Sequence, residues 1–331
     1  MERPTVLTGI KPTGHPHLGN YIGAIKPALE MAEDNRSQGI YFIADYHALN
    51  SVQDRQEFKE YTYEIAAAWL ALGLDPDKVI FYRQSDVPEI LELHWILSCM
   101  TPKGLMNRAH AYKAKVEENN LEGNDQDSGV NMGLFTYPIL MASDILLFNS
   151  DQVPVGKDQV QHVEIARDIA ENFNRTFGEV LKLPQYVIEE ETAVIPGLDG
   201  RKMSKSYGNT IPLFTEEKAL KKLINKIVTD STPPEEPKEV KGSSLFTLYK
   251  EFAAEDEIES MREKYRKGIG WGQVKKEVFE VINRELREPR RKYYEYLEDT
   301  KALDEVLKRG AQEARSIAAV QLRKVKEMIG C

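Results

Sequence analysis

Two segments of the chain carry side chains that suit the binding of phosphate groups. The first, residues 9–23 (GIKPTGHPHLGNYIG), lies between an apolar run and a helical pattern. His17 and Asn20 can donate hydrogen bonds to phosphate oxygens, Gly19 would let a ribose or base approach the backbone, and a helix N-terminus favours negative charge. Because the segment lacks the G-x-G-x-x-G and P-loop patterns, on its own it is more often an ordinary turn before a helix.

The second segment is residues 202–206 (KMSKS), in a loop after an apolar stretch. Lys202 and Lys205 suit a pyrophosphate group that moves during a reaction, and Ser204 and Ser206 can hydrogen-bond it. A pair of lysines in a loop is ordinarily a solvated turn, but the complete five-residue string rarely arises by chance.

A third feature is a carboxylate inside a very apolar helical pattern. Asp144 interrupts residues 134–148 (LFTYPILMASDILLF). An isolated buried charge is prohibitively costly in free energy, so Asp144 must have a partner. The sequence leaves open whether that partner is backbone, an Arg or Lys side chain, or a ligand.

The first half of the chain alternates strand and helix patterns, which would position these residues. This order predicts an α/β fold with a doubly wound, Rossmann-type parallel sheet. In such sheets, ligands bind beyond the carboxyl ends of the strands, where residues 9–23 would lie. Residues 116–130 are polar and predict a mobile loop. The predicted strands are 5–10, 39–48, 78–83 and 152–155, with an extended stretch at 186–195, and the predicted helices are 21–32, 55–72, one beginning at Pro88, 133–148 and 159–177.

The second half is charged and helix-periodic, with a Pro/Glu-rich break at residues 231–243. We therefore predict a Rossmann-fold catalytic domain over residues 1–200 and an all-helical domain over residues 201–331. The predicted helices are 215–228, 256–267, 273–286 and 300–329.

The net charge of −9 argues weakly against nucleic-acid binding, because neutralising phosphates needs clustered cations. Two local basic clusters oppose that argument. One is residues 284–292 (RELREPRRK), and the other consists of Lys218, Lys221, Lys222 and Lys226 at near-helical spacing. Each cluster alone is typical of a solvated helix face.

Several functional classes are disfavoured by composition. No apolar run is long enough for a membrane span, and the N-terminus lacks a secretory pattern. The two cysteines, Cys99 and Cys331, have no metal-ligand spacing. We expect a cytoplasmic protein without a disulfide or a protein-bound metal site.

The combination of KMSKS with His17-Leu18-Gly19-Asn20 about one domain upstream resembles the two signatures of class I aminoacyl-tRNA synthetases. Over nearly its whole length, the chain resembles the bacterial tryptophanyl-tRNA synthetases. The supporting stretches are residues 8–14 (TGIKPTG, apart from Lys11), 45–48 (DYHA), 84–88 (QSDVP), 137–146 (YPILMASDIL), 153–159 (VPVGKDQ) and 229–231 (TDS).

The resemblance implies a two-step reaction. The carboxylate of tryptophan attacks the α-phosphate of ATP, and the terminal adenosine of the tRNA then takes the aminoacyl group. Neither step needs a protein nucleophile, because positioning and charge stabilisation drive such transfers. Lys202 and Lys205 would stabilise the pyrophosphate, with the larger effect from Lys205. Lys115 would reach the ATP phosphates, although a solvated lysine beside a loop explains it almost as well.

The other residues implied for ATP binding lie in three parts of the chain: Lys11, Pro12, Thr13, His17, Gly19 and Asn20; Gly156, Lys157, Asp158 and Val194; and Met203, Ser204 and Ser206. Mg²⁺ is expected with ATP, although no dedicated carboxylate cage is visible.

Amino-acid selection would centre on Asp144, which by resemblance accepts the indole N–H. Phenylalanine lacks that donor and would leave the acceptor unpaired. Tyr137 and Gln159 would hold the α-amino group, and His47 would lie nearby, although a lone histidine is more often structural. The residues implied for the ring pocket, each of which could equally be core, are Met141, Ile145, Val153 and Val155.

The helical half would recognise the tRNA anticodon, with residues 284–292 as a candidate. Members of the resembled family are homodimers in which one tRNA spans both subunits. Two departures limit the transfer of roles: Lys11 replaces a common Gln, and the stretch 116–130 is longer than usual, which makes the match of Lys115 less secure. His17, where close relatives often carry Thr, follows the general class I pattern.

Three alternatives remain from the sequence. A tyrosyl-tRNA synthetase shares the fold and a pocket carboxylate, but KMSKS and residues 141–146 (MASDIL) and 156–159 (GKDQ) fit the tryptophanyl pattern better. A small-molecule adenylyltransferase with an HxGH turn usually lacks a long helical domain. A non-catalytic paralogue is disfavoured by the intact signatures.

Overall fold

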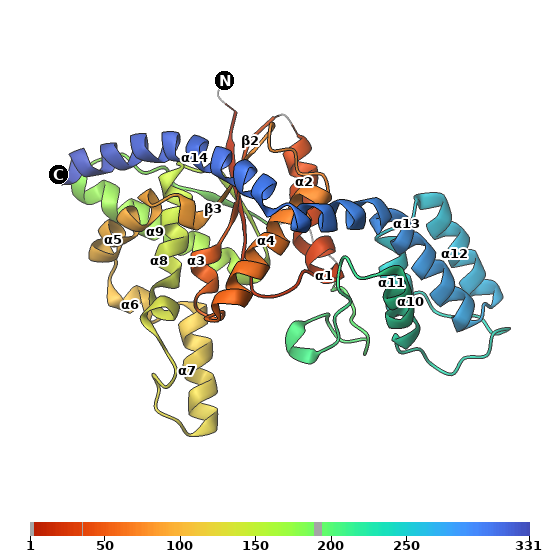
Figure 1. The fold of residues 1–331 in the computed structure, drawn as a ribbon. Helices are drawn as coiled ribbons and strands as arrows, with labels where there is room; N and C mark the ends of the chain where they lie inside the picture. Colours follow the sequence, from red (N-terminus) through yellow and green to blue (C-terminus); the bar gives the residue numbers. More distant parts are fainter. Residues whose placement is uncertain (1–2, 35, 189–193) are drawn as a thin grey trace.

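The computed structural model describes residues 3–34, 36–188 and 194–331. Within them, five parallel strands form one sheet in the order β3-β2-β1-β4-β5 (Figure 1). From β1, the chain adds β2 and β3 on one side of the sheet and then adds β4 and β5 on the other side. This change of side defines a doubly wound sheet, so the predicted fold class is confirmed. The strands are β1 (Thr5–Ile10), β2 (Gln38–Ile43), β3 (Ile80–Arg83), β4 (Gln152–Val155) and β5 (Gln185–Ile188).

Alternate residues of the central strands enter two different cores. In β2, Ile40 and Phe42 belong to one buried cluster, whereas Tyr41 and Ile43 belong to the other. This follows from the two-residue period of a strand and explains the continuous apolar run of a sheet that is covered on both faces. The helices of the first half are α1 (Leu18–Asn20), a π-helical turn (Tyr21–Ile25), α2 (Lys26–Glu33), α3 (Asp45–Ala48), α4 (Arg55–Ala71), α5 (Glu89–Met100), α6 (Lys103–Met106), α7 (His110–Glu122), α8 (Met132–Leu147) and α9 (Val160–Phe177).

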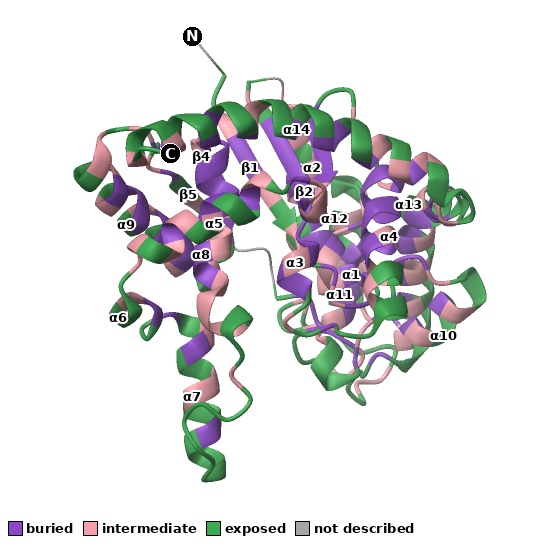
Figure 2. Cartoon of the chain, turned by 60° about the vertical axis from the view of Figure 1, so that its left-hand side comes forward, coloured by how far each residue is buried: buried purple, intermediate pink, exposed green. Residues whose placement is uncertain are grey.

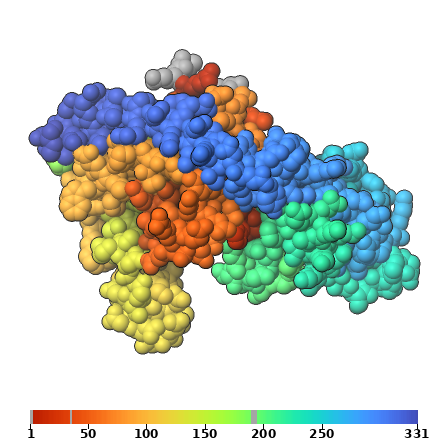
Figure 3. Space-filling view, in the orientation of Figure 1, coloured from red at the N-terminus to blue at the C-terminus, as the bar shows by residue number. Residues whose placement is uncertain are grey.

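The helical half consists of four helices, and a fifth helix returns to the sheet. Helix α14 (Thr300–Ile329) lies along β3 and α5, so that Gly310 packs directly on the backbone of Phe81 (Figures 1 and 3). A Cβ at Gly310 would lie 1.9 Å from the Phe81 carbonyl oxygen, so glycine is required there. The division predicted at residue 200 did not anticipate this return. The four helices are α10 (Glu217–Lys226), α11 (Ser244–Lys250), α12 (Glu255–Lys267) and α13 (Trp271–Glu298).

The predicted loop over residues 116–130 is wrong in its first part. Helix α7 continues to Glu122 and ends at Gly123, which adopts the left-handed conformation with φ 73°. The buried Asn119 side chain then donates to the carbonyls of Gln126 and Ser128 and holds the following turn. Figure 2 shows α7 projecting away from the sheet as a largely exposed element.

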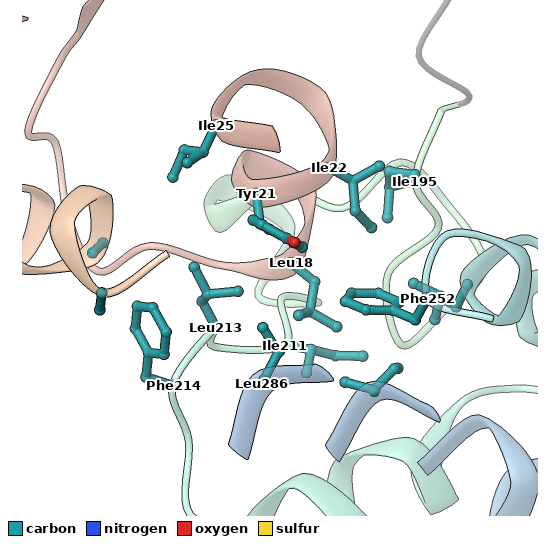
Figure 4. Packing of buried hydrophobic residues seen from close by; sticks show 14 of the residues in the cluster. Leu18, Tyr21, Ile22, Ile25, Ile195, Ile211, Leu213, Phe214, Phe252 and Leu286 are labelled. Atoms are coloured by element: carbon teal, nitrogen blue, oxygen red, sulfur yellow. The ribbon is translucent and has the colours of Figure 1, made fainter. Parts of the chain in front are cut away.

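The two halves share one apolar core around the first helix after β1. Leu18 lies among Ile211, Leu213 and Phe252 (Figure 4). Backbone hydrogen bonds from Leu18 to Ile211 and from Leu213 to Pro16 tie the same segments together. The helical half therefore fixes the position of the loop between β1 and α1. None of the described helices combines the length and apolar character that a membrane span requires.

Candidate active site

A cavity of about 360 Å³ opens at the carboxyl ends of β1, β2 and β4. Its volume falls in the usual range for small-molecule sites, and its walls are largely apolar with a few polar groups. The structure brings ten of the predicted site residues together in this lining: Lys11, His47, Tyr137, Met141, Asp144, Ile145, Val153, Val155, Gly156 and Gln159. Gly9 also lines it, and a side chain there would collide with the Phe42 ring.

Asp144 is almost fully buried at the cavity wall and has hydrogen-bond donors as partners. The Nε2 of His47 lies 2.9 Å from Oδ2, and the amide nitrogen of Gln84 lies 2.8 Å from Oδ1 and 2.9 Å from Oδ2. Burial raises the pKa of Asp144, while the hydrogen bonds from His47 and Gln84 oppose that rise. The partners are therefore His47 and Gln84 rather than an arginine or lysine.

Gln84 is a site residue that the sequence analysis did not single out. It is completely buried after the end of β3, and its Oε1 accepts a hydrogen bond of 3.1 Å from the Tyr46 backbone. This bond fixes the orientation of the amide, because a flipped amide would point oxygen at the Asp144 carboxylate. The stretch 84–88 was used only for the family resemblance, and nothing local in it marks a carboxylate partner.

Replacing Gln84 with methionine should lower kcat/KM for the amino-acid substrate by about tenfold, because one charge-assisted hydrogen bond to Asp144 is lost. Amino-acid-dependent ATP–pyrophosphate exchange measures this effect. Gln321→Met is the matched control, since Gln321 is also buried but bonds the Val180 carbonyl far from the cavity. Equal losses in both variants would show that Gln84 acts only through stability.

Tyr137 closes another side of the cavity between two histidine rings. Its ring centre lies 5.1 Å from that of His47 and 4.8 Å from that of His162, both edge-on. Its hydroxyl donates to Gln159 Oε1 at 3.2 Å, so the two residues predicted to hold an amino group are adjacent. Burial lowers the pKa of His162 to about 4, which keeps this ring neutral near pH 7. The sequence analysis missed His162.

Lys11 places a positive charge beside this aromatic wall. Its ammonium nitrogen lies 5.8 Å from the centre of the Tyr137 ring, within the range of a cation–π interaction. Burial lowers the pKa of Lys11. A carboxylate or phosphate in the cavity would gain from this poorly solvated cation.

The helix after β1 starts with a reciprocal cap that defines its free hydrogen-bonding groups. His17 Nδ1 accepts from the Asn20 backbone at 3.3 Å, and Asn20 Oδ1 accepts from the His17 backbone at 3.1 Å. Burial and the charge of Lys205 lower the pKa of His17 to about 4. Because Nδ1 is an acceptor, the neutral ring carries its proton on Nε2, and this N–H and the Asn20 amide remain as donors.

The two phosphate-type segments meet although 184 residues separate Gly19 from Met203. The Gly19 N–H lies 3.4 Å from the Met203 sulfur. Lys205 Nζ donates to the Thr13 carbonyl at 3.2 Å and lies against Gly14. Burial lowers the pKa of Lys205, and the nearby Glu64 carboxylate opposes this change. The geometry therefore places an ammonium group where the two segments join.

Asn209 holds the second segment in shape. Its Oδ1 accepts from the Ser204 backbone at 2.8 Å, and its Nδ2 donates to Asp199 at 2.7 Å and to the Lys202 carbonyl at 3.1 Å. Asn209 is buried, whereas the residues Lys202, Lys205 and Ser206 are exposed. The loop thus has a fixed base and accessible cations.

Several predicted residues lie outside the cavity lining. Lys115 on α7 pairs with Glu118 at 2.8 Å. Val194 is exposed and directly follows residues that the structure does not describe. Lys157 and Asp158 form an exposed turn after Gly156. Their roles toward a nucleotide stay predictions.

The basic cluster at residues 284–292 is largely engaged within the molecule. Arg284 makes two hydrogen bonds to Glu257, at 2.8 and 2.7 Å, and Arg291 pairs with Glu288 and Glu295. Arg290 is buried. These interactions weaken the argument that this cluster is a free phosphate-binding face.

Comparisons with known proteins agree with this arrangement. A family model described as tRNA synthetases class I (W and Y) matches residues 1–287. A Tryptophan--tRNA ligase of Pseudomonas putida is 52% identical over 98% of this chain and 73% of its own length. One of Neisseria meningitidis is 50% identical over 100% of this chain and 98% of its own. The tryptophanyl-tRNA synthetase of Campylobacter jejuni, solved with ADP and tryptophan, has a TM-score of 0.90 and 48% identity over 99% of this chain and 100% of its own.

Proposed function

The chain belongs to the class I tRNA synthetases of the tryptophan and tyrosine type, and from this membership we infer that it is an ATP-dependent ligase that joins tryptophan to its tRNA. The observation that carries the choice of an aromatic amino acid with a hydrogen-bond donor on its ring is the buried carboxylate of Asp144 on the cavity wall. Its two protein partners both present donors, so a further ligand group that it binds must also be a donor, as the indole N–H is. A tyrosine-specific site remains the nearest rival, and the relatives at about half identity, named for tryptophan, argue against it.

In the first step, a carboxylate oxygen of tryptophan would bond to the α-phosphorus of ATP while the bond to the bridging oxygen breaks. The released electron pair leaves with pyrophosphate. We propose that Asp144 orients the indole and that Tyr137 and Gln159 hold the α-amino group. His17 and Asn20 would donate to phosphate oxygens, and Lys202 and Lys205 would stabilise the charge on pyrophosphate.

In the second step, a hydroxyl of the terminal adenosine of the tRNA would attack the carbonyl carbon of the adenylate, and AMP would leave. No side chain that lines the described cavity is placed as a nucleophile by this scheme. The contribution of the chain is to hold reacting groups in line and to surround them with fixed donors.

Mg²⁺ would accompany ATP and neutralise phosphate charge. Among the described lining residues, the one carboxylate is Asp144, which already has His47 and Gln84 as partners. We therefore propose that the phosphates of ATP and water would hold Mg²⁺, as is usual for this ion.

For the domains, we propose residues 1–200 for binding ATP and tryptophan and residues 201–331 for the KMSKS loop and tRNA. The proposed division needs one change, because α14, which lies late in the sequence, packs against the sheet of the first domain. Its residues Ala311, Ala314 and Leu322 lie in the same buried cluster as β2 and β3.

We also propose that the chain forms a homodimer through α5. Leu91, Trp95 and Cys99 are exposed at four-residue intervals, so they form one outer stripe, and 71% of Trp95 is exposed. A large exposed aromatic side chain in an apolar stripe is typical of an interface.

Trp95→Glu should convert the dimer to a species of half the molar mass, because a buried unpaired carboxylate would destabilise the interface. Size-exclusion chromatography with light scattering measures this change. Leu121→Glu is the control, since Leu121 is 90% exposed on the projecting α7. A dimer that persists in Trp95→Glu would place the interface elsewhere.

Aminoacylation tests the proposed function as a whole. With labelled tryptophan, ATP and a bacterial tryptophan tRNA transcript, the protein should form acid-precipitable tryptophanyl-tRNA. A tyrosine tRNA transcript with labelled tyrosine should give none. Charging with tyrosine alone would overturn the assignment.

A further inference from the structure

Four of the six exposed residues of α10 are lysines. Leu220 and Ile224 bury the opposite face of the helix in the core shared by the two halves. The exposed residues after the first, Glu217, are Lys218, Lys221, Lys222, Asn225 and Lys226. At 100° per residue, these five side chains cover one continuous face opposite the buried stripe.

Several cations of the neighbouring helices α12 and α13 have carboxylate partners. On α12, Arg262 and Arg266 form ion pairs with glutamates three residues away, and on α13 Lys276 pairs with Glu280. Among the described residues, the structure gives no ion pair to Lys218, Lys222 or Lys226. Lys221 lies 5.7 Å from the centre of the Phe279 ring, an interaction that leaves its charge intact.

The spacing of the lysines opposes helix stability. Lys218 and Lys222, and Lys222 and Lys226, are like-charge pairs four residues apart, and such pairs destabilise a helix. A polyanion bound to this face would relieve the repulsion. If this face contacted only solvent, alternating positive and negative side chains, as on α12, would stabilise the helix better.

The location of α10 links this face to the candidate active site. Just before α10, the backbone N–H of Leu213 donates a hydrogen bond to the Pro16 carbonyl in the loop after β1. Just after α10, the backbone N–H of Val228 donates a hydrogen bond to the Leu198 carbonyl near KMSKS. Helix α10 packs on α13, where Lys275 donates to the Asn225 carbonyl and adds a fifth cation at the edge. The ribbon views show α10 in the helical half, and the segment forms part of the surface in the space-filling view (Figures 1–3).

We propose that the lysine face of α10, formed by Lys218, Lys221, Lys222 and Lys226, binds the phosphate backbone of the tRNA substrate. This proposal rests on the proposed function and names the surface that its RNA substrate contacts. It favours α10 over residues 284–292, where Arg284 and Arg291 already have glutamate partners and Arg290 is buried. Contacts to phosphates position an RNA and depend strongly on salt, but they carry no sequence information.

The test compares the 331-residue protein with a triple variant of the same chain, Lys218→Ala, Lys222→Ala and Lys226→Ala. Alanine favours helix, so the fold of α10 should persist. Binding of a bacterial tryptophan tRNA transcript is measured at several salt concentrations. The slope of log K against log salt should become shallower by about two to three, since each lost phosphate contact removes about 0.7–0.9. The KM for tRNA should rise at least about tenfold.

Two controls make the result specific. The variant Lys301→Ala, Lys308→Ala and Lys324→Ala removes three exposed lysines from α14 and should bind tRNA with the wild-type slope. Replacing the three α10 lysines with arginine should restore binding. Tryptophan-dependent ATP–pyrophosphate exchange, which needs no tRNA, should be unchanged in every variant. Wild-type affinity and slope in the α10 alanine variant would overturn the proposal, whereas absence of exchange in the wild type would overturn the proposed function instead.

Discussion

Replacing Lys205 with alanine is expected to slow tryptophan activation by about 10²–10³-fold, the usual effect of losing one fixed electrostatic contact to a transition state. Its ammonium group lies at the junction of the two phosphate-type segments, 3.2 Å from the Thr13 carbonyl. Lys205 as a whole residue is exposed, but partial burial of its ammonium group lowers its pKa. The loss should appear mainly in kcat, because charge on the leaving pyrophosphate grows as the reaction proceeds.

Single-turnover formation of tryptophanyl-adenylate measures this step directly. Lys202→Ala should show a smaller loss, because Lys205, whose ammonium group lies at the junction of the two segments, is expected to contribute more. Lys308→Ala, on the exposed surface of α14, should match the wild type. If Lys205→Ala retained more than about a third of wild-type kcat, the proposed role of Lys205 would be untenable.

Replacing Asp144 with asparagine should lower kcat/KM for tryptophan by about 10²-fold. A hydrogen bond to a charged group contributes about 1.5–3 kcal/mol, which corresponds to roughly 10- to 150-fold. Asparagine keeps the size of the side chain but has one acceptor oxygen in place of two. His47, Gln84 and the indole N–H would then compete for it.

An isosteric substrate separates recognition from folding in this variant. In 3-benzothienylalanine, sulfur replaces the indole N–H, so the analogue cannot donate to Asp144. Wild-type enzyme should strongly prefer tryptophan, because the analogue leaves a buried acceptor unpaired. Asp144→Asn should narrow that preference. A proportional loss for both substrates would mean that Asp144 has a structural role only.

The strands could be predicted because strands that are buried on both faces of a sheet appear in the sequence as continuous apolar runs. Residues 5–10 and 152–155 are strands β1 and β4 at the predicted bounds. The predicted strand at 39–48 was too long, because Asp45–Ala48 turns into the short helix α3, and this turn places His47 beside Asp144. An apolar run alone does not show where such a turn begins.

The sequence patterns of helices α7 and α13 were too weak to predict their full extents. Helix α7 buries only Tyr112 and Asn119, so no apolar period marks it. Helix α13 was predicted to end near residue 286 but continues past Pro289, because Tyr293 is buried beyond the proline and offsets the lost backbone hydrogen bond.

Some residues of the candidate site could likewise be predicted from the sequence, and others could not. The ten predicted residues in the cavity came from motif resemblance combined with chemical type. Gln84 and His162 were missed because their partners are distant in sequence and meet only after folding. Asn209 has partners within ten residues, but a single asparagine in a loop gives no local signal of them. The proposed contacts of Lys115 and Val194 with ATP stay predictions.

The most direct test of the central claim is ATP–pyrophosphate exchange by the wild-type protein with tryptophan, tyrosine and phenylalanine supplied separately. Exchange that depends on tryptophan and falls to background with the other two is the predicted result. Exchange with tyrosine in preference to tryptophan, or with none of the three, would contradict the assignment of this cavity to tryptophan activation.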